Sequence, residues 1–426
     1  MKVWLIAAVI LLVAVLSAPL FTVFGAFVLY AFSAADIDTS VIIIELYRIA
    51  ETPMLVAIPL FVFAGYLLAE SQAPKRMVAL AQALFGWSTG GLAIVTVLTC
   101  AVFTAFTGAS GVTIIALGGM LLPILLKEGY PERFSLGLIT ASGNIGLLFP
   151  PSLAVILYGL IAQVSIDQLF LAGLLPGIVL ILFVSGYAVW TGKVARIPKV
   201  PFSWSNIASS ARSALWEIPL PIIVIGGIYG GVFTATEAAA VTAFYVFIVE
   251  VFIYRDLHLV RDVPRVMKES MILVGATLSI LGLAFGLTNY LVDQQVPQML
   301  LAMLEDRITS QVSFLLILNG FLLIVGMVME MFPAIIVVVP LVLPIAERFN
   351  VDPLHLGIIF LTNLEVAYLI PPFGLNLFLS SLRFKKPVFH VARATMVFVL
   401  IEVAALLVIT YIPELSLWLV RASGNP

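Results

Sequence analysis

The chain has 426 residues, of which 62% are hydrophobic and only 10% are charged, and its formal net charge is −2. A soluble domain carries roughly 25% charged residues, so this composition excludes an ordinary soluble globular protein and makes a lipid bilayer the solvent for most of the chain. The near-neutral charge also excludes a nucleic-acid-binding surface, and one Cys with three His residues leaves no framework for disulfides, zinc or haem.

Charge-poor runs long enough to cross a bilayer, about 20 residues each, follow one another along the chain. The first run follows Lys2 and is too long for the apolar region of a cleaved signal peptide, so we expect a retained first span. The predicted spans lie near residues 3–32, 52–69, 134–162, 169–190, 218–235, 236–254, 270–292, 354–382 and 394–420.

Two further apolar runs contain a break and predict helical hairpins. Residues 87–126 carry no charge but are interrupted by Gly108-Ala109-Ser110-Gly111. Residues 308–346 carry acidic Glu330 near the middle, close to Gly326 and Pro333. Because glycine and proline interrupt helices, each run predicts two antiparallel helices joined by a short tip.

Sequence landmarks recur at a constant offset and predict an internal repeat. Pro123 recurs as Pro344 and Pro150-Pro151 recurs as Pro371-Pro372, both 221 positions later. Since basic residues mark cytoplasmic loops, placing the 21 Lys and Arg residues gives the second copy the opposite orientation in the membrane. Inverted repeats of this kind are typical of secondary transporters, whose substrate and ion sites lie near the middle of the membrane.

The predicted fold is therefore an all-α polytopic membrane protein with inverted repeats, each containing a re-entrant hairpin and a broken transmembrane helix. We divide the chain into an N-terminal span with a periplasmic segment, a first repeat, a cytoplasmic connector with one scaffold span, and a second repeat. Their ranges are 1–51, 52–190, 191–235 and 236–426. The hairpins are predicted at about 88–127 and 309–346, and the broken spans at about 132–164 and 353–382.

The proline breaks are the places where ion chemistry is expected. Prolines and glycines in the stretch Ser142–Ser152 free backbone carbonyls that a regular helix would use, and sodium prefers such oxygens. Ser110, Thr107, Ser142 and Asn144 offer side-chain oxygens as well. The alternative is a simple proline kink whose polar side chains satisfy the freed backbone groups.

In the second copy Glu365 stands where the first copy has Asn144. A carboxylate within a span costs roughly 2.5 kcal/mol or more on insertion scales, and it usually marks a functional site. Glu365 could bind sodium, bind a proton or hydrogen-bond while neutral. Glu330, at the second hairpin tip, raises the same alternatives. By contrast, Thr234-Ala-Thr-Glu237 fits a capping box, which predicts a structural role for Glu237.

One enzyme motif requires an alternative interpretation. Gly108-Ala109-Ser110-Gly111 resembles the nucleophile motif of rhomboid intramembrane proteases, and an intramembrane serine hydrolase is therefore a distant alternative. That chemistry needs a buried histidine to activate Ser110, but all three histidines lie in or beside charged loops. The chain also lacks a phosphate-binding Gly-x-x-x-x-Gly-Lys-[Ser/Thr] motif, which argues against ATP-driven transport.

The sequence resembles the large membrane subunit of tripartite ATP-independent periplasmic (TRAP) transporters over nearly its whole length. The resemblance rests on short motifs distributed along both halves, namely Ile58-Pro59-Leu60-Phe61 to Gly65, Gly108–Thr113, Gly129-Tyr130, Pro150-Pro151-Ser152, Phe170–Gly173 with Pro176-Gly177, Gly230–Val241 and Pro371-Pro372 with Gly374. It implies a multi-pass protein of the bacterial inner membrane that is not an enzyme. It also implies sodium-driven import of an organic acid, a dicarboxylate or sugar acid, by an elevator mechanism.

Two partners follow from the resemblance: a small membrane subunit with four spans and a periplasmic substrate-binding protein. A single-component sodium/anion symporter or ion exchanger of related architecture is the nearer alternative. The only cofactors implied are sodium ions. The resemblance places them between each hairpin tip and its Pro-Pro loop, with one site at Ser110, Gly143, Asn144 and Pro150 and the other at Gly326, Glu330, Asn363 and Pro371.

The chain departs from the family at two positions, because Ile370 replaces a frequent Thr and Ala367 a frequent Gly. We hypothesise that Glu365 compensates for the missing hydroxyl ligand at the second sodium site; the alternative is that this site differs in its number of ligands or in its ion. No basic residue is available to hold the substrate, so backbone N–H groups at the helix N-termini of the hairpin tips are expected to bind an organic anion. The predicted substrate-binding residues are Thr107, Ser110, Gly111, Thr113, Ser152 and Asn376.

Overall fold

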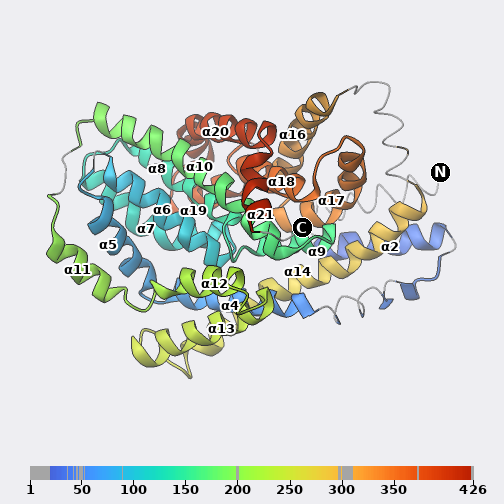
Figure 1. Cartoon of the computed structure of the whole chain (residues 1–426), viewed down its shortest axis with the longest axis horizontal. Helices are drawn as coiled ribbons and strands as arrows, with labels where there is room; N and C mark the ends of the chain where they lie inside the picture. The colour runs from blue at the N-terminus through green and yellow to red at the C-terminus, as the bar shows by residue number, and fades with distance from the viewer. Residues whose placement is uncertain are drawn as a thin grey trace.

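The computed structural model describes residues 20–35, 37–41, 43, 44, 47, 51, 53–88, 90–197, 201–295, 299, 310–371 and 374–423. Every regular element in these ranges is a helix, as the composition predicts (Figure 1). Part of the first predicted span, the first residue of the second hairpin (309) and Pro372 lie outside the described residues.

The first half of the described chain runs from α2 to α10. Its helices are α2 (Leu20–Ala34), η1 (Pro53–Val56), α4 (Ala57–Glu70), α5 (Ala73–Phe85), α6 (Gly91–Thr107), α7 (Ser110–Lys127), α8 (Glu132–Ser142), η2 (Ile145–Leu148), α9 (Leu153–Ala162) and α10 (Ile166–Val194).

The second half follows a connector. Its helices are α11 (Trp204–Ser213), α12 (Pro219–Tyr229), α13 (Ala235–Ile248), the π-helical turn η3 (Val249–Ile253), α14 (Asp262–Asp293), α16 (Gln311–Val328), α17 (Met331–Arg348), α18 (Pro353–Ala367), α19 (Leu375–Phe384), α20 (Val388–Tyr411) and α21 (Glu414–Ala422).

Many of these helices are suited to lipid. Among the described residues, seven are long and apolar enough to cross a membrane, and an eighth span results if one bent pair is counted as a single crossing. That pair, Glu132–Leu148 and Leu153–Ala162, is bent by 44° at the Pro150-Pro151 break. The predicted run 394–420 is not one helix: α20 ends at Tyr411 and α21 begins at Glu414, because Pro413 between them cannot continue the hydrogen-bond ladder.

The first hairpin consists of α6 and α7, and its tip is Gly108-Ala109. Gly108 adopts a φ of +65°, a left-handed conformation that glycine reaches without strain, and this ends α6. A Cβ atom at Gly108 would lie 3.1 Å from Cβ of Leu153, so the tip packs closely against the start of α9.

The second hairpin consists of α16 and α17, and its tip is Met329-Glu330. Gly326 therefore lies inside α16, and Pro333 lies in the first turn of α17, where its missing N–H is tolerated. The tip packs against the end of α18, since a Cβ atom at Gly326 would lie 2.6 Å from Cβ of Ala367. Each hairpin tip thus lies beside a helix next to a Pro-Pro sequence: α9 follows Pro150-Pro151, and α18 precedes Pro371-Pro372.

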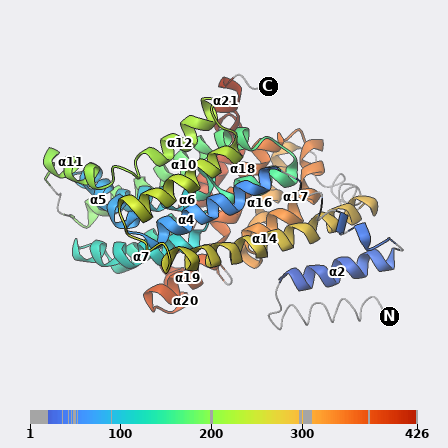
Figure 2. The same cartoon turned by 90° about the horizontal axis from the view of Figure 1, so that it is seen from below.

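The main hydrophobic core of the described residues lies around α6, α9, α10 and α18, and two smaller clusters lie between α2 and α14 and between α19 and α20. In both views α14 runs along one edge of the molecule beside α2, while α5 and α11 lie together at the far end (Figures 1 and 2). The capping box predicted at Thr234 is confirmed: the Thr234 hydroxyl accepts from the Glu237 N–H, and the Glu237 carboxylate accepts from the Thr234 N–H.

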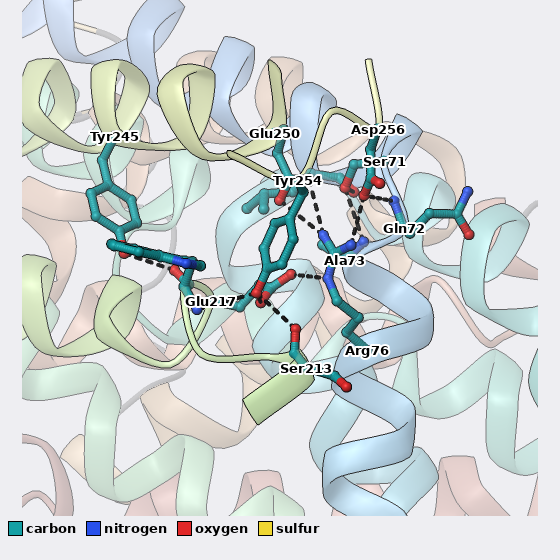
Figure 3. A network of polar contacts seen from close by, with 12 residues as sticks. Ser71, Gln72, Ala73, Arg76, Ser213, Glu217, Tyr245, Glu250, Tyr254 and Asp256 are labelled. Atoms are coloured by element: carbon teal, nitrogen blue, oxygen red, sulfur yellow. Dashed lines mark hydrogen bonds and ion pairs between the residues drawn. The ribbon is translucent and has the colours of Figure 1, made fainter. Parts of the chain in front are cut away.

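One buried charge network joins three segments on the side of the molecule where α5 lies (Figure 3). Arg76 of α5 forms ion pairs with Glu217, Glu250 and Asp256 and lies over the Tyr254 ring, 3.8 Å from its centroid. Burial raises the pKa of the Tyr254 hydroxyl to about 12, so it stays protonated and donates to the Ser213 carbonyl over 2.7 Å. The network fastens α5 to the α11–α12 connector and to the loop after η3.

Candidate functional site between the hairpin tips

A cavity of about 250 Å³ lies where the two hairpin tips approach each other. Its lining includes Ser110 and Gly111 of the first tip, Glu330 and Met331 of the second, and Tyr368 after α18. The helices α7 and α17 both begin at this cavity, at Ser110 and Met331. Because a helix N-terminus carries unpaired N–H groups and partial positive charge, the cavity suits a small anion.

A larger cavity of about 360 Å³ lies between α5, α6 and the α11–α12 connector. Its walls are mainly aliphatic and aromatic, including Leu80, Leu84 and Phe85. The helix α12 begins beside it, but its first turn contains Pro219 and Pro221, which have no N–H to offer. The smaller cavity is therefore the better candidate for substrate, since specific sites combine apolar walls with a few convergent polar groups.

Ser110 and Asn376, both predicted to bind substrate, lie in contact. The Ser110 hydroxyl donates to Oδ1 of Asn376 over 2.8 Å, and both side chains are buried. Asn376 in turn donates weakly to the Thr140 carbonyl over 3.4 Å, and the Thr140 and Ser380 hydroxyls lie 2.8 Å apart. This chain of contacts ties the first hairpin to α8 and α19, which lies beyond the second Pro-Pro sequence.

The first hairpin also contacts the broken span directly. The Thr104 hydroxyl donates to the Gly143 carbonyl over 2.8 Å, and it lies 2.6 Å from the Thr113 hydroxyl. A Cβ atom at Gly143 would lie 2.7 Å from Cγ1 of Ile114, so glycine at this position allows the broken span to lie close to α7. Thr113 therefore lies behind the tip, in the contact between hairpin and loop.

The remaining predicted substrate residues lie away from the cavity wall. Thr107 is buried and only weakly hydrogen-bonded, with the carbonyls of Thr104 and Ala109 at 3.5 and 3.4 Å. Ser152 is buried at the start of α9, where its hydroxyl accepts from the Val155 N–H over 3.5 Å. Its contact is that of a helix cap, which is also the common role of a serine after a proline break.

The two predicted ion-binding segments touch each other at the centre of the molecule. Nδ2 of Asn144 donates to the backbone carbonyl of Glu365 over 2.6 Å. These residues occupy corresponding positions in the two halves, and so do Ser142 and Asn363. All four side chains are buried, and each has at least one oxygen without a hydrogen-bond partner: Ser142 Oγ, Asn144 Oδ1, Asn363 Oδ1 and both carboxylate oxygens of Glu365.

Buried polar oxygens without hydrogen-bond partners are rare and require a physical reason, because each one lowers the stability of the fold by about 1–3 kcal/mol. A bound cation supplies such a reason, since sodium takes carbonyl, hydroxyl and carboxylate oxygens as ligands. The donor set present at Ser142, Asn144, Asn363 and Glu365 therefore fits sodium.

Asn363 shows how the second segment is held. Its Nδ2 donates to Oδ1 of Asn319 over 2.7 Å and to the Ile359 carbonyl over 2.8 Å. Asn319 lies on α16 of the second hairpin and donates to the Thr410 hydroxyl of α20 over 3.2 Å. The sequence reasoning missed Asn319, although an amide inside an apolar helix was a usable signal.

Glu402 was also missed. It lies in the middle of the apolar helix α20 and is only 1% exposed, and its Oε1 has no hydrogen-bond partner among the described residues. A carboxylate within an apolar span was a signal of the kind that identified Glu365. Of the other predicted sodium residues, Glu330 is half-buried at the cavity, Gly326 contacts Ala367, and Pro150 and Pro371 lie in the loops after η2 and α18.

This arrangement, a helical membrane protein with two hairpins whose tips meet broken helices around a cavity with apolar walls and a few polar groups, is that of a membrane transporter. A solved structure with a similar fold is that of the YdaH transporter of Alcanivorax borkumensis, with a TM-score of 0.61, 14% identity, and coverage of 90% of this chain and 88% of that one. Comparison with known sequences identifies the family within this class.

Residues 3–415 match the family described as "Tripartite ATP-independent periplasmic transporter, DctM component". The C4-dicarboxylate TRAP transporter large permease protein DctM of Pseudomonas aeruginosa is 36% identical over 394 residues, 92% of each chain. The ectoine/5-hydroxyectoine large permease UehC of Ruegeria pomeroyi is 32% identical, over 86% of this chain and 85% of that one. The chain belongs to the DctM family, and it is the large permease component of a TRAP transporter in the bacterial inner membrane.

This family assignment confirms the resemblance and decides between the alternatives. The chain is a component of a tripartite transporter, so a single-component symporter or exchanger is not supported. Neither is a serine hydrolase, because the relatives are named permeases and the Ser110 hydroxyl donates to Asn376.

Proposed function

We propose that the chain imports a small organic acid by sodium symport, through the cavity between the hairpin tips. The observation that carries the proposal is the set of buried, unpartnered oxygens at the ends of α8 and α18, where the two broken spans are interrupted. The sodium sites proposed are those of the sequence analysis, with Ser110, Gly143, Asn144 and Pro150 at the first tip and Gly326, Glu330, Asn363 and Pro371 at the second.

The charge of the cavity supports coupling between sodium and an anionic substrate. Among the described residues that line the cavity, Glu330 is the only carboxylate and none is Lys or Arg. An anion beside an ionised Glu330 is repelled, whereas sodium bound by Glu330 removes this repulsion. Bound sodium therefore increases the affinity of the cavity for the anion, and the bound anion increases its affinity for sodium, which is the thermodynamic requirement for symport.

The substrate proposed is a small carboxylate or sugar acid. Two helix N-termini at the cavity support an anion, and relatives are named for C4-dicarboxylates. Other relatives are named for ectoine and isethionate, so the family accommodates different small solutes. We propose that a periplasmic binding protein delivers the substrate and that a four-span small subunit completes the membrane complex. One relative is named DctMQ, a single permease chain longer than this one.

Uptake into proteoliposomes tests the proposal. The liposomes contain this chain with the small subunit and binding protein encoded beside it, and a carboxylate is supplied under an inward sodium gradient or an equal potassium gradient. We expect uptake that requires sodium and all three components. Uptake that is equal in sodium and potassium would refute the sodium assignment.

The Glu330→Gln variant tests whether Glu330 couples sodium binding to substrate binding or only supports the structure. Removing the charge should leave substrate binding possible but make uptake less steeply dependent on sodium concentration. Glu414→Gln is the matched control, because Glu414 is exposed at the start of α21 and pairs only with Arg421. If both variants keep the wild-type sodium dependence, Glu330 does not couple the two ligands.

A further inference from the structure

The cavity between the hairpin tips has few polar side chains. Four of the described residues that line it carry one, namely Tyr66, Ser110, Glu330 and Tyr368. The larger side chains of the wall are otherwise apolar: Val112, Ile115, Leu147, Leu273, Met331, Phe332, Leu375 and Leu379. Its volume of about 250 Å³ is below the roughly 300–1,000 Å³ of pockets for drug-sized ligands, so a ligand that fits it is small.

The N-terminus of α17 has little left to offer an anion. Its first N–H group, that of Met331, donates to the hydroxyl oxygen of Tyr368 over 2.6 Å. Its third residue, Pro333, has no N–H. Of the first three positions of this helix, only Phe332 therefore keeps a free backbone donor at the cavity.

The N-terminus of α7 is free. The N–H groups of Ser110, Gly111 and Val112 have no hydrogen-bond acceptor among the described residues, and all three residues line the cavity. Adjacent unpaired N–H groups at the start of a helix bind anionic oxygens well. The cavity therefore has one full set of backbone donors, and this set suits a single carboxylate.

Two tyrosine hydroxyls add donors to the same cavity. Tyr368 is 3% exposed, and because its oxygen accepts from the Met331 N–H, its proton is left without an acceptor among the described residues. Tyr66 is half-buried on α4, and its hydroxyl has no hydrogen-bond partner in the described part of the chain.

Close packing brings Tyr66 to the first hairpin tip. The helix α4 lies beside both α6 and α14 (Figure 2). A Cβ atom at Gly65, the preceding residue, would lie 2.6 Å from Cα of Thr107, so α4 touches the backbone at the end of α6. Tyr66 thus lies near the start of α7, where the backbone donors are free.

We propose that the cavity takes a small monocarboxylic acid with an apolar body, whose carboxylate binds at the N-terminus of α7 and accepts hydrogen bonds from the Tyr66 and Tyr368 hydroxyls. The body of the acid lies against the apolar wall and is removed from water there, which favours binding. This inference deepens the proposed function, on which it rests for the transport of an acid, and narrows its substrate class.

The wall is unsuited to dicarboxylates and to sugar acids. The sodium ion proposed at Glu330 balances the charge of that residue, and no described Lys or Arg lines the cavity to balance a second carboxylate of the substrate. A sugar acid carries several hydroxyls, and each one that is buried against apolar side chains without a partner costs about 1–3 kcal/mol of binding free energy. A single carboxylate on an apolar body avoids both costs.

Binding of three five-carbon acids tests the proposal, because they differ only in their polar groups. Pentanoate has one carboxylate, glutarate has two, and xylonate has one carboxylate and four hydroxyls. Saturable binding of each radiolabelled acid is measured on the purified full-length chain in lipid nanodiscs, in sodium buffer. We expect pentanoate to bind tighter than either of the others by about tenfold or more, which corresponds to about 1.4 kcal/mol. Relatives are named for C4-dicarboxylates, so glutarate is the decisive comparison.

Tyr66→Phe tests the hydroxyl assigned to the carboxylate. The variant keeps the ring and removes one donor to a charged group, so we expect pentanoate to bind about tenfold more weakly. Tyr187→Phe is the matched control and should bind as the wild type does. Tyr187 is also half-buried without a hydrogen bond among the described residues, but it lies on α10 against Phe134 and Phe398.

Three outcomes would overturn the proposal: glutarate or xylonate binding at least as tightly as pentanoate, no saturable binding of pentanoate, or wild-type affinity for pentanoate in Tyr66→Phe. Repeating the measurements with choline in place of sodium separates this proposal from the proposed function. If sodium has no effect on affinity, the coupling to sodium is wrong, whereas the order of the three acids still tests the substrate class.

Discussion

Gly326→Ala tests whether the second hairpin tip depends on close contact with α18. The added Cβ would lie 2.6 Å from Cβ of Ala367, 2.8 Å from Cδ2 of Leu364 and 3.2 Å from Cα of Leu364. Carbon atoms normally approach to about 3.5–4.0 Å, so the two helices must separate by about 1 Å. Overpacking of this kind costs about 1–3 kcal/mol.

The first hairpin suggests how to reverse this effect. In the first hairpin the alanine lies on the hairpin helix and the glycine on the broken span. Ala105 of α6 packs against Gly146, where an added Cβ would lie 2.8 Å from the Ala105 nitrogen. Positions 105 and 326 correspond at the repeat offset, and so do 146 and 367. Adding Ala367→Gly to Gly326→Ala therefore recreates the arrangement of the first hairpin. The contact with Cα of Leu364 persists, so we expect most, but not all, of the lost stability to return.

Thermal unfolding of the purified chain measures both effects. Gly326→Ala should lower the unfolding temperature by a few degrees. Gly320→Ala is the matched control on the same helix, since no atom lies within 4 Å of its added Cβ and alanine favours helix by about 1 kcal/mol. The reasoning is refuted if Gly326→Ala is as stable as Gly320→Ala, or if the double variant is no more stable than Gly326→Ala.

Three further perturbations test other parts of the structure. Arg76→Gln leaves three carboxylates without their partner and should lower the free energy of unfolding by about 3–5 kcal/mol. Arg265→Gln breaks an exposed pair with Glu70 and should lower it by about 0.2–1 kcal/mol. Equal losses in chemical denaturation would contradict the conclusion that the Arg76 network is buried. Thr234→Ala removes the cap of α13 and should cost about 1 kcal/mol in the same assay, and a neutral result would mean that the box contributes no stability. Ser110→Ala removes the donor to Asn376 beside the cavity, and we expect proteoliposome uptake to need a higher substrate concentration for half-maximal rate; an unchanged concentration would place the substrate elsewhere.

Local signals were sufficient to find the breaks in the helices. Glycine and proline change the backbone regardless of the surroundings, so the tip at Gly108-Ala109 and the bend at Pro150-Pro151 could be read directly. The second tip was predicted at Glu330 and lies at Met329-Glu330, although neither of these residues is a glycine or a proline. The capping box at Thr234 was also readable, because both of its hydrogen bonds are made within one helical turn.

The candidate site was only partly predictable. Glu365 and Asn144 were identified because polar residues within apolar spans are costly, and their positions matched across the repeat. That they contact each other was not evident from either segment, and Glu402 was overlooked although it obeys the same rule. The separate roles of Ser152 and Thr113 likewise required three dimensions, since one caps α9 and the other contacts Thr104.

The sequence by itself determined that this chain is a helical membrane protein and where its helices are interrupted, because hydrophobicity, proline and glycine act on nearby residues. Only the tertiary structure decided which interruptions meet. Asn144 and Glu365 are 221 positions apart in the sequence, yet they are in contact, and their unpartnered oxygens become significant only because burial removes water from both.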